Sequence, residues 1–212
     1  MFLTQKTSLI RKMNWPNPNH AVLTLLLLGV LIRPATLRAE DSPSPLANAT
    51  ILIIRHAEKP ASGKELNEAG QARAKAYPAY FQHLTLDGQP VKIDAVFATA
   101  DSKGSCRPRR TVEPTARALG LPLDTRFSDK NADLLAKELE TRPHGKTILI
   151  CWHHGQIPEL VHDLGAKPAS VLPHGSWPAE TFDWMLVLHY NAQGQMIAAR
   201  RVPEHLMPGD SQ

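Results

Sequence analysis

Short apolar runs alternate along this chain with segments that have the composition of helices. Three runs, 51–54, 93–99 and 146–152, consist mostly of Ile, Val, Leu, Ala and Phe. Continuous apolar runs of this length are typical of strands that are buried on both faces of a parallel sheet. Strands that alternate with helices predict an α/β protein: a three-layer α/β/α sandwich with a mostly parallel central sheet and helices on both faces.

Four segments between and after these strands are predicted to be helical. They are 66–84, 109–120, 131–140 and 156–165. Asn67 is a suitable capping residue for the first helix, and Pro78 should kink or end its first section. Gly120 and Gly165 should end the second and fourth helices, because glycine favours the backbone conformation that follows a helix.

Two further patterns complete the predicted fold. The third helix places Leu134, Leu135 and Leu139 on one face, which we expect to pack against the sheet. Segments 182–190 and 195–202 flank the turn sequence "NAQG", so they should pair as an antiparallel hairpin.

The first 39 residues differ in charge from the rest of the chain. They contain five basic residues and no acidic ones. Removing these five from the 24 basic residues leaves 19, against 20 acidic residues in the remainder. The high pI of about 9.2 therefore reflects the start of the chain, and we expect no nucleic-acid partner.

The basic start precedes an apolar stretch at 21–32, which is shorter than the roughly 20 residues that a membrane span needs. Together they predict an export signal within residues 1–39, with cleavage near Ala39 and a periplasmic or secreted protein. The alternative is an uncleaved anchor in the inner membrane, which would be the only membrane contact. We predict a flexible linker at 40–49, one domain at 50–204 and a tail at 205–212.

Polar side chains follow each of the three predicted strands. Arg55 and His56 follow the first, Arg107 ends the loop after the second, and His153 and His154 follow the third. The carboxyl ends of parallel strands lie at one edge of a sheet, where ligands bind. Guanidinium groups grip phosphate oxygens, and a neutral imidazole acts as a nucleophile or a donor. The pattern predicts a phosphate site that uses no metal and no cofactor.

Four segments occur in a fixed order between about residue 50 and residue 164: "RHAEKP", "LNEAGQARA", "CRPRRTVEPTA" and "ILICWHHGQIPELV". Together they resemble the signature segments of the histidine phosphatase superfamily, which also contains the phosphoglycerate mutases. The resemblance implies a phosphatase that hydrolyses phosphomonoesters or phosphohistidine through a covalent phosphohistidine. The alternatives are a phosphomutase and a non-catalytic phosphate-binding or sensor module of the same fold.

The resemblance also implies residue roles. His56 matches the nucleophile that forms the phosphohistidine, and Arg55 and Arg107 match the two phosphate clamps. His154 matches the second histidine of the pocket when the segment is aligned on Trp-x-His-Gly. An alignment on the following proline selects His153 instead, so both histidines are candidates for binding phosphate.

The proton donor is less defined, because this chain has Gly155 where phytase-like members carry an aspartate after the second histidine. Glu58 lies closest in sequence to the nucleophile and is our first candidate. Asp129, Glu180 and Asp183 are the other candidates.

Three questions are left open by the sequence. The substrate is expected to be a small-molecule or glycan-linked phosphate, but the residues do not define which, and they do not define the oligomeric state. Cys106 and Cys151 both lie beside site motifs. They are expected either to form a disulfide, which an oxidising compartment favours, or to be two free thiols.

Overall fold

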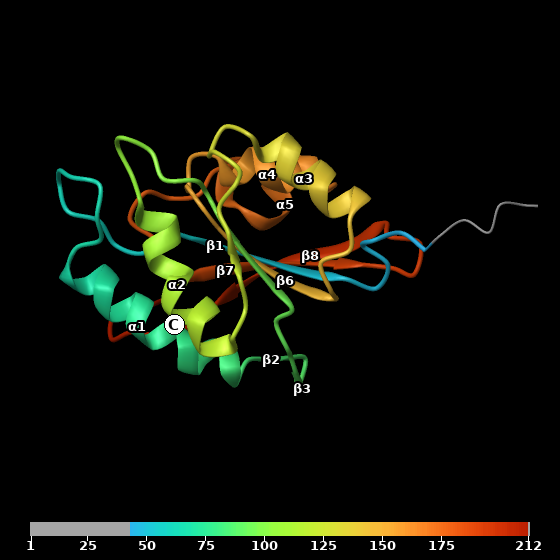
Figure 1. Ribbon diagram of the computed structural model, residues 1–212, viewed down its shortest axis with the longest axis horizontal. Coiled ribbons are helices and arrows are strands. Elements are labelled where there is room, and N and C mark those ends of the chain that lie inside the picture. Colours follow the sequence, from blue (N-terminus) through green and yellow to red (C-terminus); the bar gives the residue numbers. More distant parts are fainter. Residues whose placement is uncertain (1–42, 212) are drawn as a thin grey trace, which may run out of the picture. The chain divides into compact units, whose positions relative to one another are not determined.

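Six strands form one mixed sheet at the centre of the fold (Figure 1). They are β1 (Thr50–Arg55), β4 (Ala95–Ala98), β5 (Leu123–Asp124), β6 (Thr147–Trp152), β7 (Trp184–Tyr190) and β8 (Met196–Pro203), in the order β5-β4-β6-β1-β7-β8. The first four in this order run parallel, whereas β7 is antiparallel to both of its neighbours. The mostly parallel sheet and the closing hairpin are therefore confirmed.

The computed structural model describes residues 43–211. The predicted export signal, its cleavage site and the alternative anchor at 21–32 lie outside these residues. Within residues 43–211, no helix combines the length and the apolar character that crossing a membrane requires.

Helices cover both faces of the sheet. They are α1 (Glu68–Gln82), α2 (Arg107–Leu119), α3 (Ala132–Thr141), α4 (Ile157–Asp163) and α5 (Pro168–Val171), with a 3₁₀ turn at Pro173–Gly175. Figure 1 shows α1 and α2 on one side of the sheet and α3, α4 and α5 on the other. The three-layer sandwich is thus confirmed, and a short hairpin of β2 (Thr85–Leu86) and β3 (Gln89–Pro90) follows α1.

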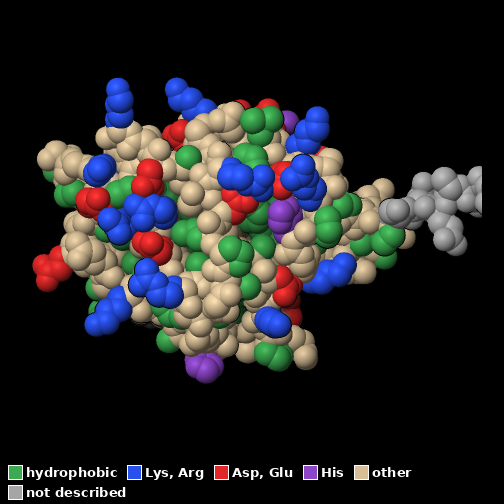
Figure 2. Space-filling model, viewed as in Figure 1, with side chains coloured by type: hydrophobic (Ala, Val, Ile, Leu, Met, Phe, Trp, Pro, Cys, Tyr) green, Lys and Arg blue, Asp and Glu red, His purple; other side chains and the backbone are tan. Residues whose placement is uncertain are grey.

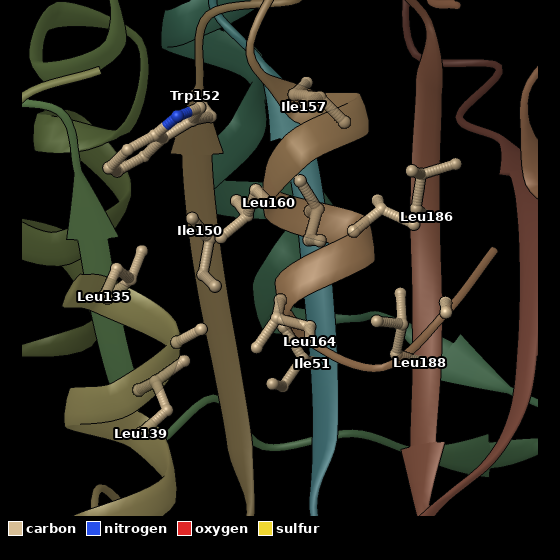
Figure 3. Close-up of a cluster of buried hydrophobic side chains, with 14 of the residues drawn as sticks. Ile51, Leu135, Leu139, Ile150, Trp152, Ile157, Leu160, Leu164, Leu186 and Leu188 are labelled. Atoms are coloured by element: carbon tan, nitrogen blue, oxygen red, sulfur yellow. The ribbon is translucent and has the colours of Figure 1, made fainter. Parts of the chain in front are cut away.

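The central strands β1 and β6 have continuous apolar runs, at 51–54 and 148–152, because both of their faces are covered. On β1, Ile51 and Ile53 point towards α3 and α4, while Leu52 and Ile54 point towards α1 and α2. Figure 3 shows the hydrophobic cluster on the α3 and α4 side of the sheet, in which Leu160 packs among side chains that include Ile150 and Leu186. This arrangement explains why residues 51–54 of β1 form a continuous apolar run, whereas a strand with one exposed face would alternate apolar and polar residues.

Two helical details differ from the prediction. Leu134 is 47% exposed, whereas Leu135 and Leu139 are fully buried. The buried face of α3 lies one position further round the helix than the leucine pattern indicates. Of the two outcomes expected at Pro78, a kink or an end, the end does not occur: α1 continues to Gln82, with Tyr77 and Phe81 buried on either side of the proline.

The segments predicted as linker and tail pack on the fold. Leu46 is buried in the core, and the Asn48 N–H donates to the Asn191 carbonyl at 2.8 Å. At the other end, the Asp210 carboxylate accepts hydrogen bonds from Arg73. The described part of 40–49 is therefore not a flexible linker, and 205–211 is not a free tail, because each contributes buried contacts.

Candidate active site

The register between β1 and β6 brings His56 close to His153 and His154. Arg55 on β1 pairs with Trp152 on β6, and the His56 N–H donates to the Trp152 carbonyl at 3.0 Å. His153 and His154 follow Trp152 directly, so their imidazoles lie beside His56. The ring centroids of His153 and His154 are 5.2 and 6.1 Å from that of His56.

His56 is buried and its protonation pattern follows from one contact. Its Nδ1 lies 2.7 Å from the Ala57 carbonyl oxygen. A carbonyl only accepts, so Nδ1 carries the proton and Nε2 keeps its lone pair. Burial lowers the pKa of His56 to about 3, and the charge of Arg55 also acts to lower it. The imidazole is therefore neutral at pH 7, and Nε2 is available as a nucleophile.

Main-chain oxygens hold one side of the Arg55 guanidinium. Its Nη1 donates to the carbonyls of Pro178, Ala179 and Thr181 at 3.1, 2.7 and 2.8 Å. The guanidinium carbon lies 3.9 Å from the centre of the Phe182 ring, in a cation–π contact. The segment before β7 therefore fixes the orientation of a fully buried cation.

The other side of the Arg55 guanidinium faces the histidines. Its Nη2 lies 3.3 Å from His154 Nδ1, which must accept because arginine only donates. Neutral His154 then carries its proton on Nε2. Burial lowers the pKa of His154 to about 4 and also lowers that of His153. The Arg55 Nε is buried and has no hydrogen-bond partner among the described residues.

Arg107, the first residue of α2, repeats the pattern of Arg55. Its Nη1 donates to the Gly63 carbonyl at 2.9 Å, and its Nε is buried without a partner in the described part of the chain. Burial is the main cause of the lowered pKa values of His56, His153 and His154, and the charge of Arg107 adds to it in all three. The charge of the Arg107 guanidinium therefore reaches all three imidazoles of the pocket.

Two neighbouring arginines on α2 belong to the surface. Arg109 forms an ion pair with Asp101 at 2.8 Å, and Arg110 forms one with Glu65 at 3.3 Å. Figure 2 shows Lys and Arg side chains interspersed with Asp and Glu over this face of the molecule. These paired cations have no contact with the histidines, which leaves Arg107 as the arginine of this helix in the site.

The first candidate for the proton donor, Glu58, is bonded elsewhere. Its carboxylate accepts three hydrogen bonds from Arg73, at 2.8, 3.0 and 3.2 Å. Both oxygens of this carboxylate are occupied by Arg73, so Glu58 is held away from the role of proton donor. Asp183 is also engaged, because it accepts from the main chain and the hydroxyl of Ser211.

Asp129 and Glu180 are the remaining candidates, and within residues 43–211 neither side chain has a hydrogen-bond partner or a salt bridge. Burial lowers the pKa of His153, and the charge of Asp129 partly opposes this effect. Glu180 acts in the same way on Arg55. Both carboxylates therefore lie within electrostatic reach of the pocket, on two different sides of it.

A pocket of about 330 Å³ adjoins the Phe182 side of the site. It is lined by Glu58, Lys59, Pro60, Ala61, Asn67, Ala179, Glu180 and Phe182. Its lining combines an aromatic ring, a lysine and carboxylates, so it is large and polar enough to hold part of a small organic group.

The cysteines and the residues of metal-binding type add no cross-link and no metal site to the described part of the chain. Cys106 and Cys151 are both buried and free, so they form no disulfide. Across residues 43–211, no three His, Cys, Asp or Glu side chains are grouped closely enough to hold a metal ion.

Some residues of the site had no role in the sequence analysis. Phe182 belongs to none of the four signature segments, and the main chain of 178–181 carries no sequence signal for its contacts with Arg55. Thr111 lies within a signature segment, and its hydroxyl bonds to the main chain of Ala57 after β1 and of Arg107 at the start of α2.

No protein-family model matches this sequence, and no curated protein matches it. Solved structures share the fold. Phosphoglycerate mutase from Plasmodium falciparum is 12% identical, with a TM-score of 0.51 over 78% of this chain and 98% of that chain. The alpha-ribazole phosphatase from Shigella flexneri is 16% identical, with a TM-score of 0.50 over 77% of this chain and 100% of that one. These neighbours are members of the histidine phosphatase superfamily, so the domain has the fold that the signature segments implied.

Proposed function

We propose that this protein is a phosphatase of the histidine phosphatase superfamily that forms a covalent phosphohistidine on His56. One observation carries the proposal. Arg55 and Arg107 each have Nη1 bonded to main-chain carbonyls and a buried Nε without a partner among the described residues. Buried donors without partners are uncommon, and the oxygens of a phosphate group would satisfy both.

The reaction follows from the protonation states of the imidazoles. His56 Nε2 attacks phosphorus while Arg55, Arg107 and the Nε2–H of His154 stabilise the charge on the phosphoryl oxygens. The bond from phosphorus to the leaving oxygen breaks, and that oxygen takes a proton from a carboxyl group. Water then attacks the phosphohistidine as the carboxylate accepts its proton. The P–N bond breaks, and inorganic phosphate and neutral His56 are released.

Asp129 and Glu180 are the two carboxyl groups that fit the proton-transfer step. Neither is held by another side chain in the described structure, and each lies within electrostatic reach of the cluster. A substrate with a good leaving group, such as phosphohistidine, requires less from this step. The pocket of about 330 Å³ next to Phe182 is where the rest of a small-molecule or glycan-linked phosphate would lie.

The test is hydrolysis of p-nitrophenyl phosphate by the purified protein. The wild type should release phosphate, and His56→Ala should reduce the rate to background while keeping the circular dichroism spectrum and the melting temperature of a folded protein. His162→Ala is the matched control, because this side chain is 77% exposed and its hydrogen-bond partner is Asp163. Quenched reactions should contain a protein-bound phosphate that is stable to base and labile to acid.

Other results would decide against a phosphatase. Tight phosphate binding without turnover by any phosphomonoester would favour the non-catalytic module. Transfer of the phosphoryl group to an added acceptor alcohol in preference to water would favour a mutase.

A further inference from the structure

One buried hydroxyl group joins the two halves of the candidate site. Thr111 on α2 is fully buried, and its Oγ1 accepts a hydrogen bond from the Ala57 N–H at 2.9 Å. The same oxygen donates its single proton to the Arg107 carbonyl at 2.8 Å. The hydroxyl accepts from the chain after β1 and donates to the first turn of α2, so it ties these two segments together.

The residue held by this bond is the one that orients His56. The Ala57 carbonyl accepts from His56 Nδ1 at 2.7 Å, which selects the tautomer with a lone pair on Nε2. The next residue, Glu58, is also held, because its carbonyl accepts from the Asn67 N–H at 3.1 Å. The position of the orienting carbonyl is thus set from α1 on one side and from α2 on the other.

We propose that Thr111 is a positioning residue that fixes the His56 imidazole relative to the Arg107 guanidinium. It acts through the Ala57 and Arg107 main chains and does not touch the phosphoryl group. The consequence for turnover rests on the proposed function, whereas the consequence for the tautomer of His56 does not. Both consequences are therefore measured.

Two substitutions separate the hydroxyl from the shape of the side chain. Thr111→Val keeps the shape and removes both hydrogen bonds, and Thr111→Ser keeps the hydroxyl and removes the methyl group. Thr115→Val is the matched control: Thr115 is also fully buried on α2, but its hydroxyl has no hydrogen-bond partner among the described residues.

The kinetic readout is hydrolysis of p-nitrophenyl phosphate by folded protein. Thr111→Val should lower kcat about 10- to 100-fold, because small misplacements of a nucleophile cost this much. Thr111→Ser should recover most of the rate, and Thr115→Val should match the wild type. A Thr111→Val protein with wild-type kcat, or a Thr111→Ser protein as slow as Thr111→Val, would overturn the proposal.

The second readout is the ¹⁵N NMR spectrum of histidine-labelled protein, in which His56 is identified by the signal missing from His56→Gln. The wild type should show His56 protonated on Nδ1, and Thr111→Val should show a mixture of tautomers. If the wild type has no phosphatase activity but this shift occurs, the proposed function fails and the role of Thr111 stands. An unchanged tautomer in Thr111→Val rules out the route through Ala57, whatever the rate.

Discussion

Two charged clusters adjoin the end of β1, and they use their hydrogen bonds differently. The imidazole cluster comprises Arg55, His56, Arg107, His153 and His154. The carboxylate cluster comprises Arg73 with Glu58, Glu204 and Asp210, which approach its guanidinium to 2.8, 3.5 and 2.6 Å. In the first cluster two buried Nε atoms have no partner among the described residues, whereas every nitrogen of Arg73 is bonded.

The pKa values of the two buried arginines reflect this difference. Burial lowers the pKa of Arg55 to about 10, and the nearby carboxylates do not compensate. Burial would also lower the pKa of Arg73, but its hydrogen bonds to Asp210 and Glu58 outweigh burial and raise it above its usual value. The nitrogens of Arg73 are all bonded within the carboxylate cluster, whereas the two buried Nε donors of the imidazole cluster would be bonded by the phosphate group of the proposed substrate. We therefore expect the carboxylate cluster to govern stability and the imidazole cluster to govern turnover.

The largest expected effect is on stability. Arg73→Ala leaves the Glu58 and Asp210 carboxylates without their cation, so the free energy of unfolding should fall by about 3–5 kcal/mol. Urea unfolding measures it, with Arg117→Ala as the control, because Arg117 is 80% exposed and its ion pair should contribute little. A loss below about 1 kcal/mol, in a range typical of surface pairs, would contradict a stabilising role for the cluster.

The second effect is on turnover. Arg107→Gln removes one of the two phosphate clamps of the proposed mechanism, so kcat/KM for p-nitrophenyl phosphate should fall about 10²- to 10³-fold. The free energy of unfolding should change by less than about 1 kcal/mol, because a buried donor without a partner is also removed. Arg110→Gln is the control on the same helix, with a side chain 47% exposed, and should retain full activity. Equal rates in the two variants would remove Arg107 from the site.

The third effect separates the two carboxyl candidates. Whichever of Asp129→Asn and Glu180→Gln removes the proton donor should slow hydrolysis of an alkyl phosphate about 10²-fold, the lower end for general acid catalysis. The same variant should hydrolyse p-nitrophenyl phosphate at nearly the wild-type rate, because that leaving group needs little protonation. If both variants retain full activity on the alkyl phosphate, neither group is the donor.

The smallest effect, taken over a single pH unit, is a dependence of stability on pH. The pKa of His56 is about 3 in the folded protein and about 6.5 in the unfolded chain, so only the unfolded chain binds this proton between these values. Stability should therefore fall as the pH falls from 6.5 towards 3, by up to about 1.4 kcal/mol per pH unit. Unfolding measured in this window should show a shallower slope for His56→Gln. Parallel slopes for the two proteins would show that His56 is protonated in the native state.

Much of the fold was predictable because its strands are covered on both faces. Continuous apolar runs located β1 and β6, and the turn sequence located the hairpin of β7 and β8. β5 has only two residues, too few for any periodicity. The packing of 44–49 was missed because its Pro, Ser and Ala composition resembles a linker, and Leu46 is the one large apolar side chain among its buried residues, the others being Ala47 and Ala49.

The candidate site was predictable as far as topology determines it. Parallel strands bring their carboxyl ends to one edge, which accounts for His56 and the histidine pair. The partner of Glu58 was not predictable, because it depends on how closely α1 approaches the chain after β1. This approach requires Gly70, where a Cβ atom would lie 2.2 Å from the Glu58 carbonyl oxygen. The contacts of Arg55 were not predictable either, since every residue type offers a main-chain carbonyl.

The pairing of Arg55 with Trp152 has a consequence for how this protein can change. The spacing between the main chain before His56 and the main chain before His153 is a property of the peptide backbone, since adjacent strands lie about 4.8 Å apart whatever their side chains. In the proposed phosphatase, substitutions around the pocket can therefore alter the choice of leaving group without rebuilding the reactive centre. Such a frame is suited to evolving, or to being engineered towards, new phosphorylated compounds.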